Sequence, residues 1–273
     1  MNLARQRNHW VPTSYLRSWT NEDRENAPLN VEFLNGSGCR TKTPESIGFE
    51  RGLYDLKNLP AAFDFIPRDF LEMDLFKGQT EPIYPRLVAN FRTKVVVATK
   101  KEIEGMAFYA LTLHYRNPVA MRLRREALTH LDLASDERGF FENRQLLTMA
   151  ALLTGVTRAL ERCFIQVLSV CSDSFLVTSD NPCSQWLEVD GIARPVSSVA
   201  EIHDAAKVKS SVALTRWIFP VTPNCLMIIS SLNENRVVIE TGRIEQAEIA
   251  NYNRLLRRAA DRFVIIRPNQ FAK

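Results

Sequence analysis

The spacing of apolar residues changes near residue 170, and this change limits what the chain can fold into. Before it, apolar residues recur at helical spacing over 101–131 and 142–170, which predicts two long helices with buried faces. After it, runs of β-branched and aromatic residues are bounded by turn residues, which is typical of antiparallel strands. Helices first and strands later indicate an α+β domain, with a helical N-terminal and central part packed on a mainly antiparallel sheet formed by the C-terminal half.

Local signals place further elements along the chain. Pro118 ends or kinks the helix over 101–131, and a helix over 70–90 is interrupted by Gly78 and Pro82. The turn Asn35-Gly36-Ser37-Gly38 separates two strands. The other expected elements are a short helix over 12–19, strands over 30–34, 52–56, 175–177, 213–219, 225–230 and 236–240, a helix over 246–261 and a closing strand over 262–266.

Length and composition predict one folded unit inside a cell. With 273 residues, 45% of them hydrophobic and 24% charged, we expect a single domain over 1–273, helix-rich over 1–170 and strand-rich over 171–273. Neither a signal peptide nor a membrane-spanning segment is indicated. Five widely spaced cysteines favour reduced thiols and a cytoplasmic location. The net charge of +4 and two groups of arginines permit nucleic acid as a partner without implying it.

Two polar and aromatic segments, 8–17 and 175–182, are far apart in the sequence but similar in character. Each sets hydrogen-bonding side chains beside a proline, Pro12 or Pro182, which is how a fold fixes the direction of polar groups. We expect them to be two walls of one site, with the early apolar side chains packed against the late sheet. His9 can act there as base, proton donor or metal ligand. Alternatively, it anchors the N-terminal segment through a backbone carbonyl.

Asp180 and Asn181 follow a predicted strand, and Pro182 fixes the exit of the chain. The oxygen atoms of residues 178–181 suit a hard metal ion, a ribose or the amide groups of the turn itself. We expect Asp180 and the His9 ring to face a shared polar cavity. Asn181 is a candidate for substrate contact in the same place.

Three glutamates are candidates for the same site. Glu72 and Glu81 lie nine residues apart, which on a continuous α-helix puts them on opposite faces, so they meet only where the helix breaks. Glu81 and Glu50 are the better candidate metal ligands, although no recognised ligand spacing is present. Arg116 stands before the Pro118 bend and can turn inward, where it would pair with Glu81, with Asp180 or with a ligand phosphate.

Several blocks of the sequence resemble a bacterial family called domain of unknown function 4238. The blocks appear in the family's order and cover most of the chain, which implies a single-domain family member whose activity is undefined. The residues that carry this resemblance are His9-Trp10-Val11-Pro12, Tyr15-Leu16-Arg17, Trp19, Phe49-Glu50-Arg51-Gly52-Leu53-Tyr54, Glu72, Glu81, Thr178-Ser179-Asp180-Asn181-Pro182 and Phe219-Pro220-Val221-Thr222-Pro223-Asn224.

These residues support two hypotheses from different functional classes. The first is an intracellular metal-dependent hydrolase of phosphodiester or nucleotide substrates, a nuclease or phosphodiesterase with Mg²⁺ or Mn²⁺. The second is a non-catalytic sensor that binds a nucleotide or a protein partner through the aromatic residues Trp10, Tyr15 and Trp19. The hydrolase hypothesis assigns catalysis to His9, Asp180 and Arg116, metal binding to Glu81, Asp180 and Glu50, and substrate contact to Tyr15, Arg17, Asn181 and His114.

Overall fold

The computed structural model describes most of the chain, and every structural statement below refers to the described residues. They are residues 7–20, 27–56, 64–92, 96–128, 152–170, 173–189, 192–196, 214–232 and 234–267, with single positions at 146, 148 and 150.

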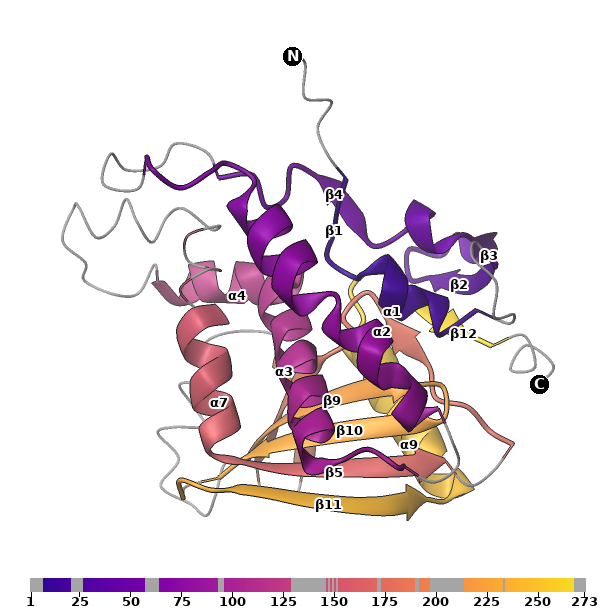
Figure 1. Ribbon diagram of the computed structural model, residues 1–273. Coiled ribbons are helices and arrows are strands. Elements are labelled where there is room, and N and C mark those ends of the chain that lie inside the picture. Colours follow the sequence, from indigo (N-terminus) through magenta and orange to yellow (C-terminus); the bar gives the residue numbers. More distant parts are fainter. Residues whose placement is uncertain are drawn as a thin grey trace.

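A six-stranded sheet built from the second half of the chain forms the base of the molecule (Figure 1). Its strand order is β11-β5-β10-β9-β7-β8. Neighbouring strands are antiparallel except for β11 and β5, which run parallel. The strands are β5 (Cys163–Val170), β7 (Ser184–Val189), β8 (Ile192–Pro195), β9 (Leu214–Thr222), β10 (Cys225–Ser231) and β11 (Val237–Ile244).

Strand β5 corrects the predicted helix over 142–170. Its residues alternate between buried and half-buried positions, with Cys163, Ile165 and Val167 facing the core, as expected of a strand with one covered face. In the described part of the chain, residues 146, 148 and 150, η5 (Leu152–Val156) and α7 (Thr157–Glu161) are helical. The predicted helix is therefore wrong from Cys163 onward, and its first residues, 142–145, lie outside the described ranges. The continuous apolar character of the segment suits a buried helix and a buried strand equally, so periodicity alone misled the prediction.

A second, four-stranded sheet joins the two ends of the chain. Its order is β3-β2-β12-β6, and all its pairs are antiparallel. Gly36 and Gly38 have φ of +81° and +75° in the turn between β2 and β3, a conformation that glycine adopts at little cost. A separate pair joins β1 to β4. The strands are β1 (Arg7–His9), β2 (Leu29–Phe33), β3 (Gly38–Lys42), β4 (Phe49–Arg51), β6 (Thr178–Ser179) and β12 (Phe263–Ile266).

These strands confirm one detail of the prediction and change others. The strand predicted over 30–34 is β2, but it joins β12 in the second sheet, so the sheets are not formed by the C-terminal half alone. The strand predicted over 52–56 lies instead at Phe49–Arg51, because Gly52 turns the chain with φ +66°. Similarly, the strand predicted over 175–177 is replaced by β6 at Thr178–Ser179.

Helices cover the six-stranded sheet. Figure 1 shows α2 and α3 across one face of this sheet, with α9 behind it. Helix α3 begins after a capping box of Thr99 and Glu102 and ends at Arg116, with Asn117 as its C-cap, because Pro118 opens α4. The helical elements are α1 (Thr13–Arg17), η1 (Pro44–Ser46), η3 (Leu71–Thr80), α2 (Ile83–Leu87), η4 (Val88–Phe91), α3 (Lys100–Arg116), α4 (Pro118–Leu128) and α9 (Gln246–Ala259).

The N-terminal block is part of the core, as predicted. The ring of Tyr15 is fully buried and stacks on Phe219 with 5.5 Å between ring centroids. Its hydroxyl lies 2.7 Å from both Thr178 Oγ1 and the carbonyl oxygen of Pro220. The predicted packing of helices on a sheet from the C-terminal half is therefore confirmed in part. The N-terminal strands β2 and β3 belong to a second sheet that was not predicted. Within the described ranges, no helix is both long enough and apolar enough to cross a membrane.

Candidate functional site

A buried polar cluster surrounds Arg116, the last residue of α3. The Arg116 side chain is fully buried, and its Nη2 donates to Glu81 Oε1 at 2.9 Å and to the carbonyl oxygen of His9. Its guanidinium lies over the Phe76 ring, 4.4 Å from the centroid. Arg116 therefore contacts two residues predicted for the same site, Glu81 through its side chain and His9 through its backbone. The His9 ring itself bonds the Glu45 backbone, as the anchoring alternative expects. We call this group, with its neighbours, the Arg116 cluster: Asn8, His9, Tyr54, Glu72, Glu81 and Arg116.

Glu72 lies in a π-helix and Glu81 directly follows it, which changes the predicted geometry. Element η3 is wound with i→i+5 hydrogen bonds, and the amide of Glu81 donates to the carbonyl of Phe76 at 2.8 Å. Such a helix turns less per residue than an α-helix, so residues nine apart return toward the same face. The charges of Glu72 and Glu81 consequently both act on Arg116. Helices of this kind occur frequently at functional sites.

Glu72 is a buried member of the cluster. Its carboxylate pairs with Lys77 at 3.0 Å, and its side chain is only 4% exposed. Several buried atoms of the cluster have no hydrogen-bond partner among the described residues. Buried polar groups normally bind a protein group or an ordered water, so these atoms mark room for water or a polar ligand. They are both polar side-chain atoms of Asn8, His9 Nε2, Glu72 Oε2, and Nε and Nη1 of Arg116.

The electrostatics of the cluster favour a charged arginine and a neutral histidine. Burial acts to lower the pKa of Arg116. The nearby Tyr54, Glu81 and Glu72 act to raise it and outweigh burial, so the pKa lies above its ordinary value and the guanidinium stays charged. Burial lowers the pKa of His9 below 6.5, and the positive charge of Arg116 lowers it further, against an opposing hydrogen bond with the Glu45 backbone. A neutral imidazole at pH 7 can accept a proton, as a general base must.

The carboxylate of Asp180 is engaged by backbone amide groups. Its two carboxylate oxygens accept the backbone N–H groups of Asp261 at 3.0 Å and Arg262 at 2.7 Å. The partners considered from the sequence were a metal ion, a ribose and the amide groups of the turn after β6. The amide groups that bind Asp180 belong to a different turn, residues 260–262, which connects α9 to β12. Asp180 therefore fastens the end of α9 to the loop that follows β6.

The carbonyl oxygen of Asp180 connects this turn to the Arg116 cluster. It accepts hydrogen bonds from Trp10 Nε1 at 3.1 Å and from Asn117 Nδ2 at 2.7 Å. Trp10 and Asn117 directly follow His9 and Arg116 in the sequence. The two predicted walls thus meet through backbone and indole contacts. The His9 ring and the Asp180 carboxylate have separate partners, and a cavity shared by them stays a prediction.

We expect the stability of the protein to depend on the protonation of Asp180. Burial raises the pKa of this carboxyl from 3.8 to about 6, against the opposing backbone hydrogen bonds. Because the folded pKa is the higher one, the folded state binds more protons between these values. The contribution of Asp180 to the free energy of unfolding is therefore fully present below pH 4, and up to about 3 kcal/mol of it is lost as the pH rises through 6.

The measurement compares wild type with Asp180→Asn, which keeps the shape of the side chain and cannot titrate. Urea unfolding at pH values between 4 and 7 should show a stability difference that changes across this window. Parallel curves for the two proteins would contradict the raised pKa.

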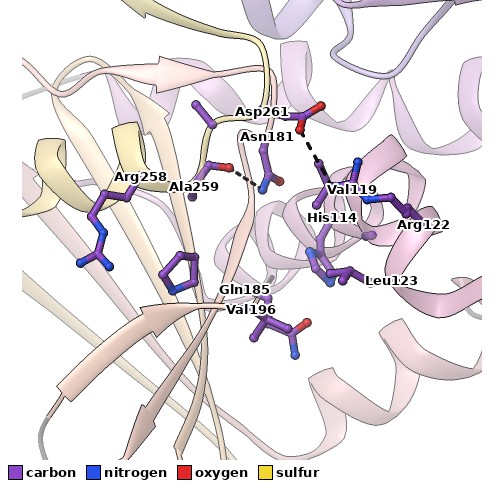
Figure 2. A pocket seen from close by; sticks show the side chains of 13 residues that line it. His114, Val119, Arg122, Leu123, Asn181, Gln185, Val196, Arg258, Ala259 and Asp261 are labelled. Carbon is purple, nitrogen blue, oxygen red and sulfur yellow. Dashed lines mark hydrogen bonds and ion pairs between the residues drawn. The ribbon is translucent and has the colours of Figure 1, made fainter. Parts of the chain in front are cut away.

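A pocket next to Arg116 brings together two other predicted residues, His114 and Asn181. Its volume is about 150 Å³, and it lies between α3, α4, the start of β7, the end of β8 and the end of α9. Figure 2 shows Arg122 and Arg258 on opposite sides, with His114 and Gln185 between them. We call it the His114 pocket, lined by His114, Val119, Ala120, Arg122, Leu123, Asn181, Gln185, Pro195, Val196, Arg258, Ala259, Ala260 and Asp261.

Hydrogen bonds position the polar groups of the His114 pocket. The ring of His114 lies with Nδ1 3.2 Å from the carbonyl oxygen of Cys183. Asn181 Nδ2 donates to the carbonyl of Ala259 at 3.1 Å, which ties the loop after β6 to the end of α9. Arg122 and Asp261 form an ion pair at 4.0 Å across the pocket.

The family model DUF4238, described as a protein of unknown function, matches residues 7–270. The chain belongs to the DUF4238 family. No curated protein and no solved structure matches it. The DUF4238 match includes the Arg116 cluster, Asp180 and the His114 pocket, and the predicted family is confirmed.

Other residues predicted for the site of this DUF4238 chain have structural partners. Tyr15 is bound in the core, Arg17 pairs with Glu45 at 3.2 Å, and Glu50 lies opposite Asn8 in the β1–β4 pair. The rings of Trp10 and Trp19 are also buried, so these aromatic residues do not form an open stacking surface.

The predicted metal ligands are not brought together either. No group of three or more histidine, cysteine, aspartate or glutamate side chains suited to a metal ion occurs in the part of the chain that the structure describes. Glu81 pairs with Arg116, and Asp180 binds the amides of residues 261 and 262. The cysteines within the described ranges, Cys39, Cys163, Cys183 and Cys225, have no disulfide, and Cys171 lies outside those ranges.

Sequence reasoning missed several polar residues of the DUF4238 chain that now stand out. The position of Asn117 could have been predicted, because an asparagine before a proline often ends a helix. Arg122 and Arg258 belong to the two groups of arginines that were considered only as a permitted contact for nucleic acid. Asp261 and Gln185 lie in no local pattern that marks them, and only the tertiary fold brings them to the His114 pocket.

Proposed function

We propose that the His114 pocket binds the phosphate group of a small phosphorylated ligand of the nucleotide class. The observation that carries the proposal is the pair of arginines on opposite sides of the pocket, from α4 and α9 (Figure 2). Arginine is the side chain best suited to phosphate, because its planar fork donates several hydrogen bonds and always carries a charge.

The charges of the pocket support an anionic ligand. Asp261 pairs with Arg122, so these two groups offset each other. Arg258 is exposed and has no carboxylate partner within the described ranges. The pocket therefore keeps an excess positive charge at one side. The amide side chains of Asn181 and Gln185 add neutral donors and acceptors that fix the orientation of a bound group.

The size of the pocket indicates how much of the ligand it holds. About 150 Å³ is less than the roughly 300–1,000 Å³ of sites that enclose a whole drug-sized molecule. We therefore assign the pocket to one end of the ligand, the phosphate and the adjoining sugar carbon. The remainder of a nucleotide would extend past the exposed Arg258 into solvent, which suits a sensor that recognises a common head group.

Calorimetric titration with AMP and with adenosine tests this proposal, because the two probes differ only in the phosphate. We expect AMP to bind and adenosine to bind at least ten times more weakly. Arg258→Ala should weaken AMP binding about tenfold or more, since a hydrogen bond to a charged group is worth about 1.5–3 kcal/mol.

Arg254→Ala is the matched control, because Arg254 lies one turn earlier on α9, is exposed and does not line the pocket. Equal losses in the Arg258→Ala and Arg254→Ala variants would assign any binding to general surface charge. Equal affinities for AMP and adenosine, or no binding of AMP, would reject the phosphate site.

Hydrolysis of a phosphodiester or nucleotide is the second candidate function. The observation in its favour is that His9, Glu81 and Arg116 meet in the Arg116 cluster and leave buried polar atoms without partners. In this mechanism neutral His9 accepts a proton from water, and Arg116 stabilises negative charge on the phosphate. Incubating the protein with ATP and a dinucleotide in Mg²⁺ or Mn²⁺ separates the two functions, because only the hydrolase releases products.

A further inference from the structure

A second hollow lies on the other side of the turn that Asp180 fastens. It has a volume of about 650 Å³ and runs between the β2–β3 hairpin, residues 46–49 and the start of β12. Its lining is richer in aromatic side chains than that of the His114 pocket. Four of these are rings from separate segments of the chain, and we call the hollow the aromatic groove after them: Trp10, Phe33, Phe49 and Phe263.

Cationic side chains accompany these rings. The guanidinium of Arg262 lies over the Trp10 ring, 4.9 Å from the centroid, and that of Arg7 lies over the Phe49 ring at 4.7 Å. Lys42 lines the groove from the end of β3 and has no carboxylate partner within the described ranges. The one carboxylate of the groove, Asp261, is engaged by Arg262 at 3.6 Å and by Arg122 at 4.0 Å.

The size and composition of the groove select a class of ligand. About 650 Å³ lies within the range of sites that enclose a small organic molecule. Phe33 and Phe49, the two partly exposed rings of the groove, favour a flat aromatic body, whereas Lys42 and Arg262 favour a negative charge on it. Leu34 is 44% exposed at the rim, and an apolar ligand would cover this large side chain.

From this combination we propose that the aromatic groove binds an aromatic organic anion, with the ring against the aromatic walls and the acidic group toward Lys42 and Arg262. The site is separate from the His114 pocket and does not depend on its function. A carboxylate, a sulfonate and a phosphate share the required chemistry, and the experiment distinguishes them.

Fluorescence titration with 8-anilinonaphthalene-1-sulfonate tests the groove on the folded full-length protein. We expect one saturable site. Bound dye should be displaced by 1-naphthoic acid at a concentration at least ten times lower than by 1-naphthalenemethanol, which has the same ring and no charge. Naphthyl phosphate in the same competition shows whether the groove prefers a carboxylate or a phosphate.

Two variants assign the binding to this groove. Lys42→Ala should reduce the preference for the acid over the alcohol at least threefold, whereas Arg40→Ala should leave it unchanged, because Arg40 lies two residues earlier on β3 and does not line the groove. Leu34→Glu should weaken dye binding at least tenfold by placing a negative charge at an exposed position of the rim.

Circular dichroism melts of each variant confirm that the fold is retained, so that loss of binding is not loss of structure. Arg258→Ala should not change dye binding, which keeps this test independent of the His114 pocket. The proposal is overturned if the dye does not saturate a single site, if the acid and the alcohol compete equally, or if Lys42→Ala and Arg40→Ala behave alike.

Discussion

Removal of residues 1–20 is expected to unfold the protein. Five large apolar side chains of this segment are each at most 3% exposed: Trp10, Val11, Tyr15, Leu16 and Trp19. Burying such a side chain stabilises a fold by about 1.5–3 kcal/mol. Their combined loss, roughly 8–15 kcal/mol, equals the entire stability of a typical domain. We expect the truncated chain to lack a cooperative thermal transition in circular dichroism.

Removal of residues 1–6 alone is the control, because β1 starts at Arg7. The shorter truncation should melt as the full chain does. A cooperative transition at the wild-type temperature in the chain without residues 1–20 would show that the late sheet and its helices fold without the N-terminal block.

Replacement of Arg116 by methionine is expected to cost about 3–5 kcal/mol of unfolding free energy. Methionine preserves the contact with the Phe76 ring but removes the positive charge. Glu81 would then lose its ion-pair partner, and Glu72, which is only 4% exposed, would keep its pair with Lys77 but lose the charge of Arg116. Uncompensated buried charge is the reason for the large effect. Urea unfolding monitored by tryptophan fluorescence measures it.

Arg122→Met is the matched control, since Arg122 is 57% exposed and its ion pair with Asp261 spans 4.0 Å. Its cost should stay below about 1 kcal/mol. The double variant Arg116→Met with Glu81→Gln should recover part of the loss, because the unpaired charge of Glu81 is gone. Equal costs for Arg116→Met and Arg122→Met would mean that the cluster does not depend on its central charge.

The sequence predicted the fold best where a local signal decides the structure. Pro118 ends α3, and the runs that became β9, β10 and β12 combine β-branched residues with clear turn signals. Strand β5 was missed because its apolar residues fit a buried helix as well. The parallel pairing of β11 with β5 depends on tertiary connections, and no local pattern carries that information.

The candidate site was predictable to a similar extent. An inward-facing Arg116 was predicted from its position before the Pro118 bend, and the cost of burying charge left Glu81, Asp180 or a ligand phosphate as its partner; the structure shows Glu81. The contribution of Glu72 was not predictable, because an α-helical angle of about 100° per residue was assumed where η3 is a π-helix. Asp180 was recognised as important, but its partners lie 81 and 82 residues later, beyond any local pattern.

The turn of residues 260–262 has a thermodynamic consequence, because it is a thin partition with a hollow on each side. Asp261 lines both the His114 pocket and the aromatic groove, and it is the counter-ion of Arg122 on one side and of Arg262 on the other. An anion that binds Arg122 weakens its ion pair with Asp261, and the Asp261 carboxylate then interacts more strongly with Arg262; an anion that binds Arg262 has the converse effect. Two ligands bound across this partition would therefore alter each other's affinity, and by the same factor in both directions.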